Sequence, residues 1–129
     1  MAKIAKTPGA RFVADLVGAL TPLGPVAARA MFGGWGIYLD GLCFALVAGE
    51  TMFFKVDGRN RPDFERAGMT PFKPWDDRPT RLVTFYEAPR AVVDDARSLR
   101  VWAGKAIEAA RAARRAKSAK AGKRRAQKR

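Results

Sequence analysis

The sequence of 129 residues has no histidine and a single cysteine, Cys43. Without histidine, imidazole base catalysis and the ordinary His-containing zinc sites are excluded. One cysteine excludes an internal disulfide, and its place in an apolar run favours a small buried thiol over a reactive one. No run reaches the roughly 18 apolar residues of a membrane span, and the N-terminus has no signal-peptide core. We therefore expect a cytoplasmic protein with no membrane partner.

Acidic residues are also scarce, and their distribution divides the chain. There are 12 Asp and Glu against 25 Lys and Arg. Residues 111–129, here called the basic segment, hold ten bases and no acid: Arg111, Arg114, Arg115, Lys117, Lys120, Lys123, Arg124, Arg125, Lys128 and Arg129. The first 110 residues hold the other 15 bases and all the acids, so they are nearly balanced. We expect one domain over 1–110 and a mobile basic tail over 111–129, which makes DNA or RNA a candidate partner.

Three helices are predicted from apolar spacing and end signals. The first covers 8–20, with Thr7-Pro8 as its N-terminal cap. A short second helix follows Asn60 as cap, ends near Gly68 and places Phe64 in the core. The third begins near Ser98, and its apolar face fades by about Ala113. Beyond that point little helix is expected, because no apolar side chains remain to be buried.

Five strands are predicted, over 26–32, 35–39, 42–47, 51–56 and 81–87. Asp40-Gly41 between two apolar runs indicates a type I′ hairpin, whose central residues both need positive φ. Residues 42–47 are apolar on both faces, which predicts a central strand covered on both sides. The sum is an α+β fold in a single domain: an antiparallel sheet of about four or five strands with helices packed on it.

Several ordered motifs resemble the N-terminal domain of the TfoX/Sxy competence regulators. They are Met31-Phe-Gly-Gly-Trp-Gly-Ile-Tyr38, Phe44-Ala-Leu-Val47, Phe54-Lys-Val-Asp57 with Arg59-Asn60, Phe64-Glu-Arg-Ala-Gly68, Pro71-Phe72 and Tyr86-Glu-Ala-Pro89. The resemblance covers about residues 8–110. It implies an α+β fold and a bacterial protein linked to the control of DNA-uptake genes. It also implies a transcription-factor partner, since full-length members act as coactivators alongside the cyclic-AMP receptor protein.

The chain departs from that family pattern at its C-terminal end. Full-length regulators carry a second, C-terminal domain, whereas we expect the basic segment to stand in its place here. Stand-alone domains of this kind have no established activity to carry over. The competence role is therefore an inference about lineage.

Two motifs that could suggest chemistry favour structural roles instead. The glycines of 32–36 are followed by a strand and lack a Gly-Lys-Ser/Thr, so they predict a bend between strands instead of a phosphate-binding loop. The pairs Asp76-Asp77 and Asp94-Asp95 lie in polar contexts where Asp caps helices. We expect no catalytic residue, no metal and no cofactor.

A second candidate nucleic-acid surface combines bases and aromatic rings. It would use Lys55, Arg59, Arg61 and Arg66, with Trp35, Tyr38 and Trp75 stacking on bases. The alternative is a set of solvated charges, with Arg59 or Arg61 paired to Asp57 or Asp63.

These observations favour a non-enzymatic regulatory or accessory domain. Its body would hold a protein partner, and the basic segment would add sequence-independent affinity for nucleic acid. The alternative is a pure protein-interaction module, homodimeric through a sheet edge, with a solubilising tail. The oligomeric state is left open.

Overall fold

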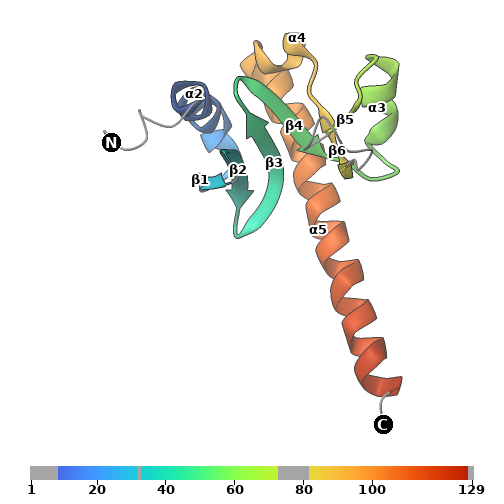
Figure 1. The fold of residues 1–129 in the computed structure, drawn as a ribbon. Helices are drawn as coiled ribbons and strands as arrows, with labels where there is room; N and C mark the ends of the chain where they lie inside the picture. Colours follow the sequence, from blue (N-terminus) through green and yellow to red (C-terminus); the bar gives the residue numbers. More distant parts are fainter. Residues whose placement is uncertain (1–8, 32, 73–81, 128–129) are drawn as a thin grey trace.

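A six-stranded antiparallel sheet forms the centre of the molecule (Figure 1). The structure, a computed structural model, describes residues 9–31, 33–72 and 82–127. The strands are β1 (Val26–Met31), β2 (Gly34–Leu39), β3 (Leu42–Ala48), β4 (Thr51–Lys55), β5 (Pro71–Phe72) and β6 (Leu82–Glu87), in the order β1-β2-β3-β4-β6-β5. Helices pack on this sheet, which confirms the predicted α+β class.

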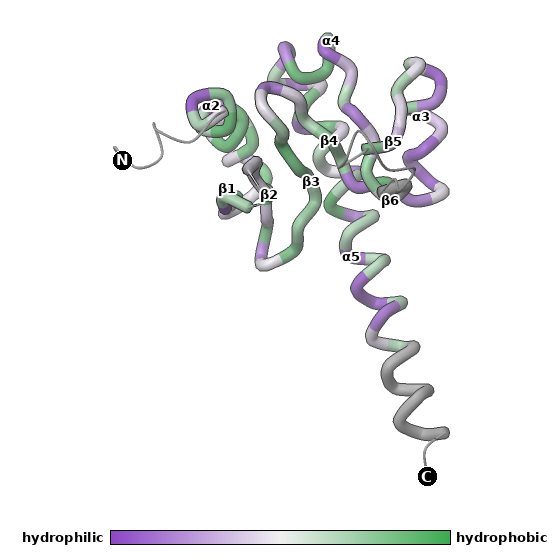
Figure 2. The backbone as a smooth tube through the Cα atoms, viewed as in Figure 1, coloured by the Kyte–Doolittle hydropathy of each residue, from purple (hydrophilic) through white to green (hydrophobic). Residues whose placement is uncertain are grey.

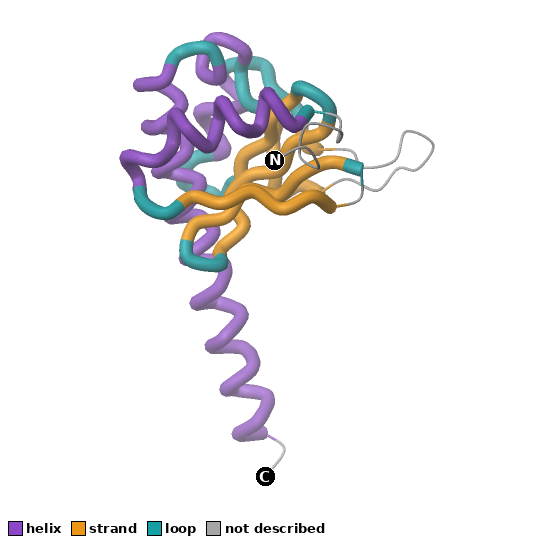
Figure 3. The backbone as a smooth tube through the Cα atoms, turned by 90° about the vertical axis from the view of Figure 1, so that its left-hand side faces the viewer, coloured by secondary structure: helices purple, strands orange, loops and turns teal. Residues whose placement is uncertain are grey.

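The described helices lie on one side of the sheet (Figure 3). They are α2 (Ala10–Leu20), the 3-10 turn η1 (Thr21–Leu23), α3 (Arg61–Arg66), α4 (Arg90–Val93) and α5 (Ala96–Gln127). Helix α2 starts at Ala10 with Gly9 at the N-cap position, two residues after the predicted start. The predicted cap Thr7-Pro8 lies outside the described residues.

Tight turns join the strands from β2 to β4. Asp40 and Gly41, between β2 and β3, have φ values of 51° and 77°. Positive φ at both central positions is the requirement of a type I′ turn, so the predicted hairpin is confirmed. The second turn, at Gly49, also has positive φ. The meander from β1 to β4 therefore forms from local signals.

Strand β3 corrects the expectation of a strand covered on both sides. Ile37 pairs with Ala45 and Tyr38 with Cys43, so Phe44 is an extra residue in a bulge. The bulge breaks the alternation: Phe44 and Ala45 are adjacent and both fully buried, whereas Cys43 is only half-buried. An unbroken strand would place neighbouring residues on opposite faces. The apolar pattern therefore reflects a bulge, and the described helices cover only one face.

Aromatic side chains fill the core between the sheet and the helices. Phe64 of α3 is 1% exposed, as predicted for the residue that places this helix in the core. Its ring centroid lies 4.7 Å from that of Trp102 on α5, 6.4 Å from Phe54 on β4 and 6.0 Å from Tyr86 on β6. The contacts with Trp102 and Phe54 are edge-to-face, and such contacts stabilise a core beyond simple burial. This cluster joins α3 and α5 to the centre of the sheet.

Helix α5 extends well beyond the sheet (Figures 1 and 2). It packs on β3 and β4 through residues such as Leu99, Ala103 and Ile107, and its burial ends at Ala110. Little helix was predicted past Ala113, but the helix continues to Gln127. Alanine, lysine and arginine all have high helix propensity, and no proline interrupts them. The lack of burial was predicted correctly: residues 113–119 are all exposed.

Candidate nucleic-acid interface

The basic segment is the projecting part of α5. Arg111 is half-buried and pairs with Glu108 one turn earlier, whereas Arg114, Arg115 and Lys117 are exposed. The side chains of Lys120, Lys123, Arg124 and Arg125 lie outside the described residues, as do residues 128–129 entirely. Of the bases whose side chains are described, three of four therefore face solvent on a helix that is docked to the core only at its other end.

The geometry of this helix presents positive charge in several directions. Successive residues of an α-helix differ by about 100°, so Arg114 and Lys117, three residues apart, share one side of the helix, and Arg115 points to another side. From Arg111 to Gln127 the helix rises about 25 Å. Glu108 is the last acid of the chain, so no carboxylate within the basic segment offsets these charges. A rod with cations around it suits a polyanion, because it can approach phosphates without a fixed register.

The second predicted surface, at the end of β4 and on α3, does not assemble as one basic cluster. Lys55 lies with its ammonium 5.0 Å from the ring centroid of Phe85. Arg59 instead pairs with Asp57 at 2.8 Å, and Arg66 pairs with Asp63 at 2.6 Å. The alternative of paired charges thus holds for Arg59 with Asp57, and Arg66, which that alternative did not name, is paired as well.

The remaining members of that surface are also separated. Arg61 is half-buried at the start of α3. Trp35, proposed as a stacking ring, is only 5% exposed and belongs to the core, so that part of the prediction was wrong. Tyr38 is half-buried on the opposite face of β2, and Trp75 lies outside the described residues. Of the predicted surface, Lys55 and Tyr38 are thus left on the face of the sheet away from the helices.

The loop from Asp57 to Asn60 fixes Arg59 against α5. Asn60, which is 3% exposed, accepts a hydrogen bond from the Asp57 N–H at 2.8 Å and donates one to the Lys55 carbonyl at 3.0 Å. It occupies the N-cap position of α3, but its side chain bonds backward into the loop instead of capping the helix. Arg59 then donates to Asp57 and, at 3.2 Å, to the backbone carbonyl of Glu108.

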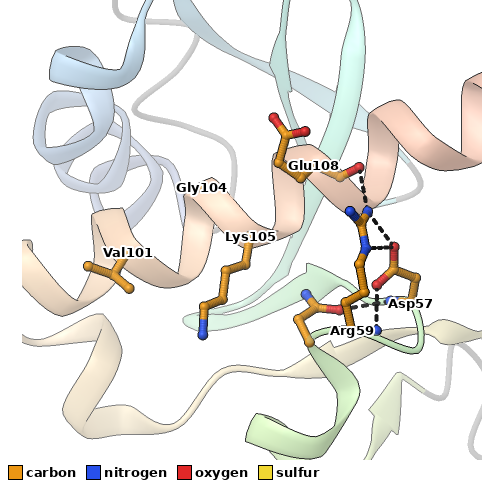
Figure 4. Close-up of a pocket in the computed structure, with 7 residues that line it drawn as sticks. Asp57, Arg59, Val101, Gly104, Lys105 and Glu108 are labelled. Carbon is orange, nitrogen blue, oxygen red and sulfur yellow. Dashed lines mark hydrogen bonds and ion pairs between the residues drawn. The ribbon is translucent and has the colours of Figure 1, made fainter.

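This loop and α5 border an open groove of about 440 Å³ (Figure 4). The side chain of Arg59 holds the pKa of Asp57 below its usual value. Lys105, also at the groove, donates to Asp63 at 2.9 Å and lowers the pKa of that carboxyl. The groove's cations are therefore already paired. These contacts join residues more than 40 positions apart, which no local sequence pattern could reveal.

The motifs that could have suggested catalysis have structural contacts. Asp95 accepts a hydrogen bond from the Ser98 N–H at 2.9 Å at the start of α5, which confirms the capping role. The Ser98 side chain, and after it the Ser98 N–H, lowers the pKa of Asp95. Asp76-Asp77 lies outside the described residues. Burial raises the pKa of the Cys43 thiol, and this disfavours the reactive thiolate form. No group of three His, Cys, Asp or Glu side chains suited to a metal occurs in the described part of the chain.

The glycine-rich turn between β1 and β2 is likewise a backbone feature. A Cβ added at Gly34 of β2 would lie 2.3 Å from the carbonyl oxygen of Val47 on β3, so these two strands approach too closely for a side chain at residue 34. Strand β2 follows directly, and no helix N-terminus is available to bind an anion. The predicted bend between strands is confirmed.

A family model describes most of this fold. The TfoX N-terminal domain model matches residues 18–110, from the end of α2 to the last buried residue of α5. The chain belongs to the TfoX N-terminal domain family. This is a family of regulatory domains that is not known to be catalytic. No curated protein matches the chain significantly.

The TfoX match ends where the basic segment begins, so the family says nothing about residues 111–129. The division into a domain over 1–110 and a tail over 111–129 stays a prediction. None of the helices in the described ranges is both long enough and apolar enough to cross a membrane.

Proposed function

We propose that this TfoX-type domain is a non-enzymatic regulatory or accessory protein whose basic segment binds the nucleic-acid backbone without reading sequence. Its folded body would hold a protein partner, and the family resemblance makes a transcription factor the expected one. The observation that carries the proposal is the extension of α5. The helix leaves the body at Ala110 with exposed bases and no acid.

Charge alone explains why such a helix would bind phosphates. Lysine and arginine side chains that neutralise phosphates release the condensed counterions, and this release supplies most of the affinity of sequence-independent binding. Like charges three or four residues apart also repel within an isolated helix. A bound polyanion would remove that repulsion, so binding and helix formation in the basic segment should support each other.

Fluorescence anisotropy with a labelled 20-base-pair duplex at 100 mM salt tests the proposal. The wild-type chain is compared with a full-length variant in which all ten bases of the basic segment are replaced by glutamine. Glutamine keeps the helix propensity but removes the charge. We expect the neutralised variant to bind at least about 100-fold more weakly.

A matched control changes the same chemistry elsewhere. The double variant Arg90→Gln and Arg97→Gln removes two exposed bases from the body and should bind within about twofold of wild type. If the neutralised variant binds as well as wild type, the basic segment is not the site.

The edge of the sheet supports a second candidate function, a homodimeric protein-interaction module. Strand β1 lies at the sheet edge, pairs only with β2 among the described strands, and is rich in alanine. Apart from the exposed Arg29, it lacks the charged residues, prolines and bulges that normally protect an edge. Sedimentation equilibrium would then show a dimer, and Ala30→Lys on the exposed edge would dissociate it.

A further inference from the structure

The face of the sheet opposite the helices carries aromatic rings and cations. Strand alternation places Phe53 there, because its neighbours Met52 and Phe54 are buried on the helix side. The same alternation places Lys55 and Phe85 there, and these two residues are cross-strand partners. We call the face that presents Arg29, Tyr38, Phe53, Lys55, Phe85 and Glu87 the outer sheet face. No helix of the described ranges covers it (Figure 3).

A cation lies over each of two of these rings. The Arg29 guanidinium lies 5.7 Å from the ring centroid of Tyr38, and the Lys55 ammonium lies 5.0 Å from that of Phe85. Both rings are half-buried, so part of each remains open to a ligand. Each pair therefore offers a π surface and a positive charge at one place.

We propose that the outer sheet face binds single-stranded nucleic acid, with bases on the rings of Tyr38, Phe53 and Phe85 and phosphates near Arg29 and Lys55. Unpaired bases stack on aromatic side chains, whereas a duplex hides its base faces. The inference rests on the proposed function in one respect: the basic segment would supply the long-range attraction, and this face would add the preference for single strands.

The spacing of the two ring-and-cation pairs fits a short stretch of strand. Tyr38 is on β2 and Phe85 on β6, three strand positions apart in the sheet. At about 4.8 Å per position they are about 14 Å apart. That distance matches about four nucleotides at the stacked spacing of 3.4 Å. Phe53 on β4 lies between them.

The charge on this face favours a nucleic acid over a protein as the occupant. Glu87, the cross-strand partner of Phe53, is the one acid among the residues that define the outer sheet face, against the cations of Arg29 and Lys55. An anionic ligand with flat aromatic groups satisfies both features of the face. Glu87 would oppose it, so removal of this charge should strengthen binding.

Two probes test the inference on the full chain: a labelled 16-nucleotide oligothymidine and a 16-base-pair duplex. We expect Phe53→Leu and Phe85→Leu each to weaken binding of the single strand about tenfold and to leave duplex binding within twofold. Lys55→Gln, which removes no core contact, should weaken single-strand binding about threefold. Glu87→Gln should strengthen it.

Phe12→Leu is the matched control, because Phe12 is a half-buried ring with the Arg90 guanidinium 6.0 Å from its centroid on the helix side of the sheet. It should change neither affinity. Thermal melting identifies variants that are not folded. If an aromatic variant is not folded, the single-strand affinities of Lys55→Gln and Glu87→Gln test the inference instead.

The outcomes separate this inference from the proposed function. If neutralising the basic segment leaves duplex binding intact, the proposed function fails, while a selective loss in Phe85→Leu would still support the outer sheet face. If Phe85→Leu, Lys55→Gln and Glu87→Gln all leave single-strand affinity unchanged, the inference is wrong. A dimer that Phe85→Leu dissociates, without any effect on the single strand, would likewise overturn it and assign the face to a second copy of the chain.

Discussion

Replacing Asn60 by alanine should lower the free energy of unfolding by about 2–3 kcal/mol. The side chain is 3% exposed and makes two hydrogen bonds, to the Asp57 N–H and the Lys55 carbonyl. Truncation leaves both backbone groups without this partner, and each such loss costs about 1–1.5 kcal/mol in a partly buried loop. For a chain of this size the melting temperature should fall by roughly 10 °C.

Urea unfolding followed by tryptophan fluorescence measures this effect. The control is Glu65→Ala, an exposed change on α3, the helix that follows Asn60. Its free energy of unfolding should stay within about 0.5 kcal/mol of wild type. Asn60→Asp sharpens the test, because it keeps the size and the acceptor but turns the donor into an oxygen facing the Lys55 carbonyl. Burial raises the pKa of such a carboxyl above its ordinary value of about 3.9, so the variant should recover stability as the pH falls toward that value and the buried acid is protonated. An Asn60→Ala protein as stable as wild type would refute the reasoning.

Three further predictions concern the strand packing, an ion pair and the basic segment. Gly34→Ala should destabilise the fold by about 1–3 kcal/mol in urea unfolding, since its Cβ would meet the Val47 carbonyl oxygen at 2.3 Å. Gly18→Ala is the contrasting change, because a Cβ at this position of α2 would meet no other atom within 4 Å, and it should stabilise the fold by about 0.5–1 kcal/mol. Lys105 lowers the folded pKa of Asp63 below its usual value of 3.8, so this pair contributes stability above that pH and loses it as the pH falls through the folded pKa. Asp63→Asn should therefore cost at most about 1 kcal/mol at pH 7, and in acid titrations monitored by circular dichroism the difference from wild type should vanish near pH 2. Deleting the basic segment should move the melting temperature by no more than about 2 °C, because burial on α5 ends before residue 111. A larger fall in the melting temperature would show that the basic segment packs on the body.

Local signals in the sequence predicted most of the sheet. The Asp40-Gly41 hairpin and the strands around it follow from turn chemistry and apolar runs, and the structure confirms them. Phe64 was placed correctly in the core because its helix has few other apolar residues. Short elements were missed: α4 is four residues long and β5 only two, so neither has room for a periodic pattern.

Features that depend on distant contacts could not be predicted. The bulge at Phe44 depends on the pairing of β2 with β3. From the sequence of β3 alone, the bulged strand has the same apolar pattern as a strand that is covered on both faces. Trp35 is buried by packing, although an aromatic residue among glycines also suits a binding surface. Arg59 could be paired with Asp57 from proximity alone, but its bond to the Glu108 carbonyl joins residues 49 positions apart.

The candidate interface shows the same division. The composition of the basic segment is evident in the sequence, but its helix is longer than predicted, because helix propensity sustains it where no side chains are buried. The rings of the predicted surface did not include Phe53 and Phe85. Their alternation with the buried Phe54 and Tyr86 is the signal that could have assigned them to the other face.

The salt dependence of duplex binding tests the central claim most directly. If about six bases of the basic segment neutralise phosphates, the logarithm of the association constant should fall against the logarithm of salt concentration with a slope near −5. The glutamine-neutralised chain should lose nearly all of that slope. A wild-type slope close to zero, or the same steep slope in the neutralised chain, would contradict the account.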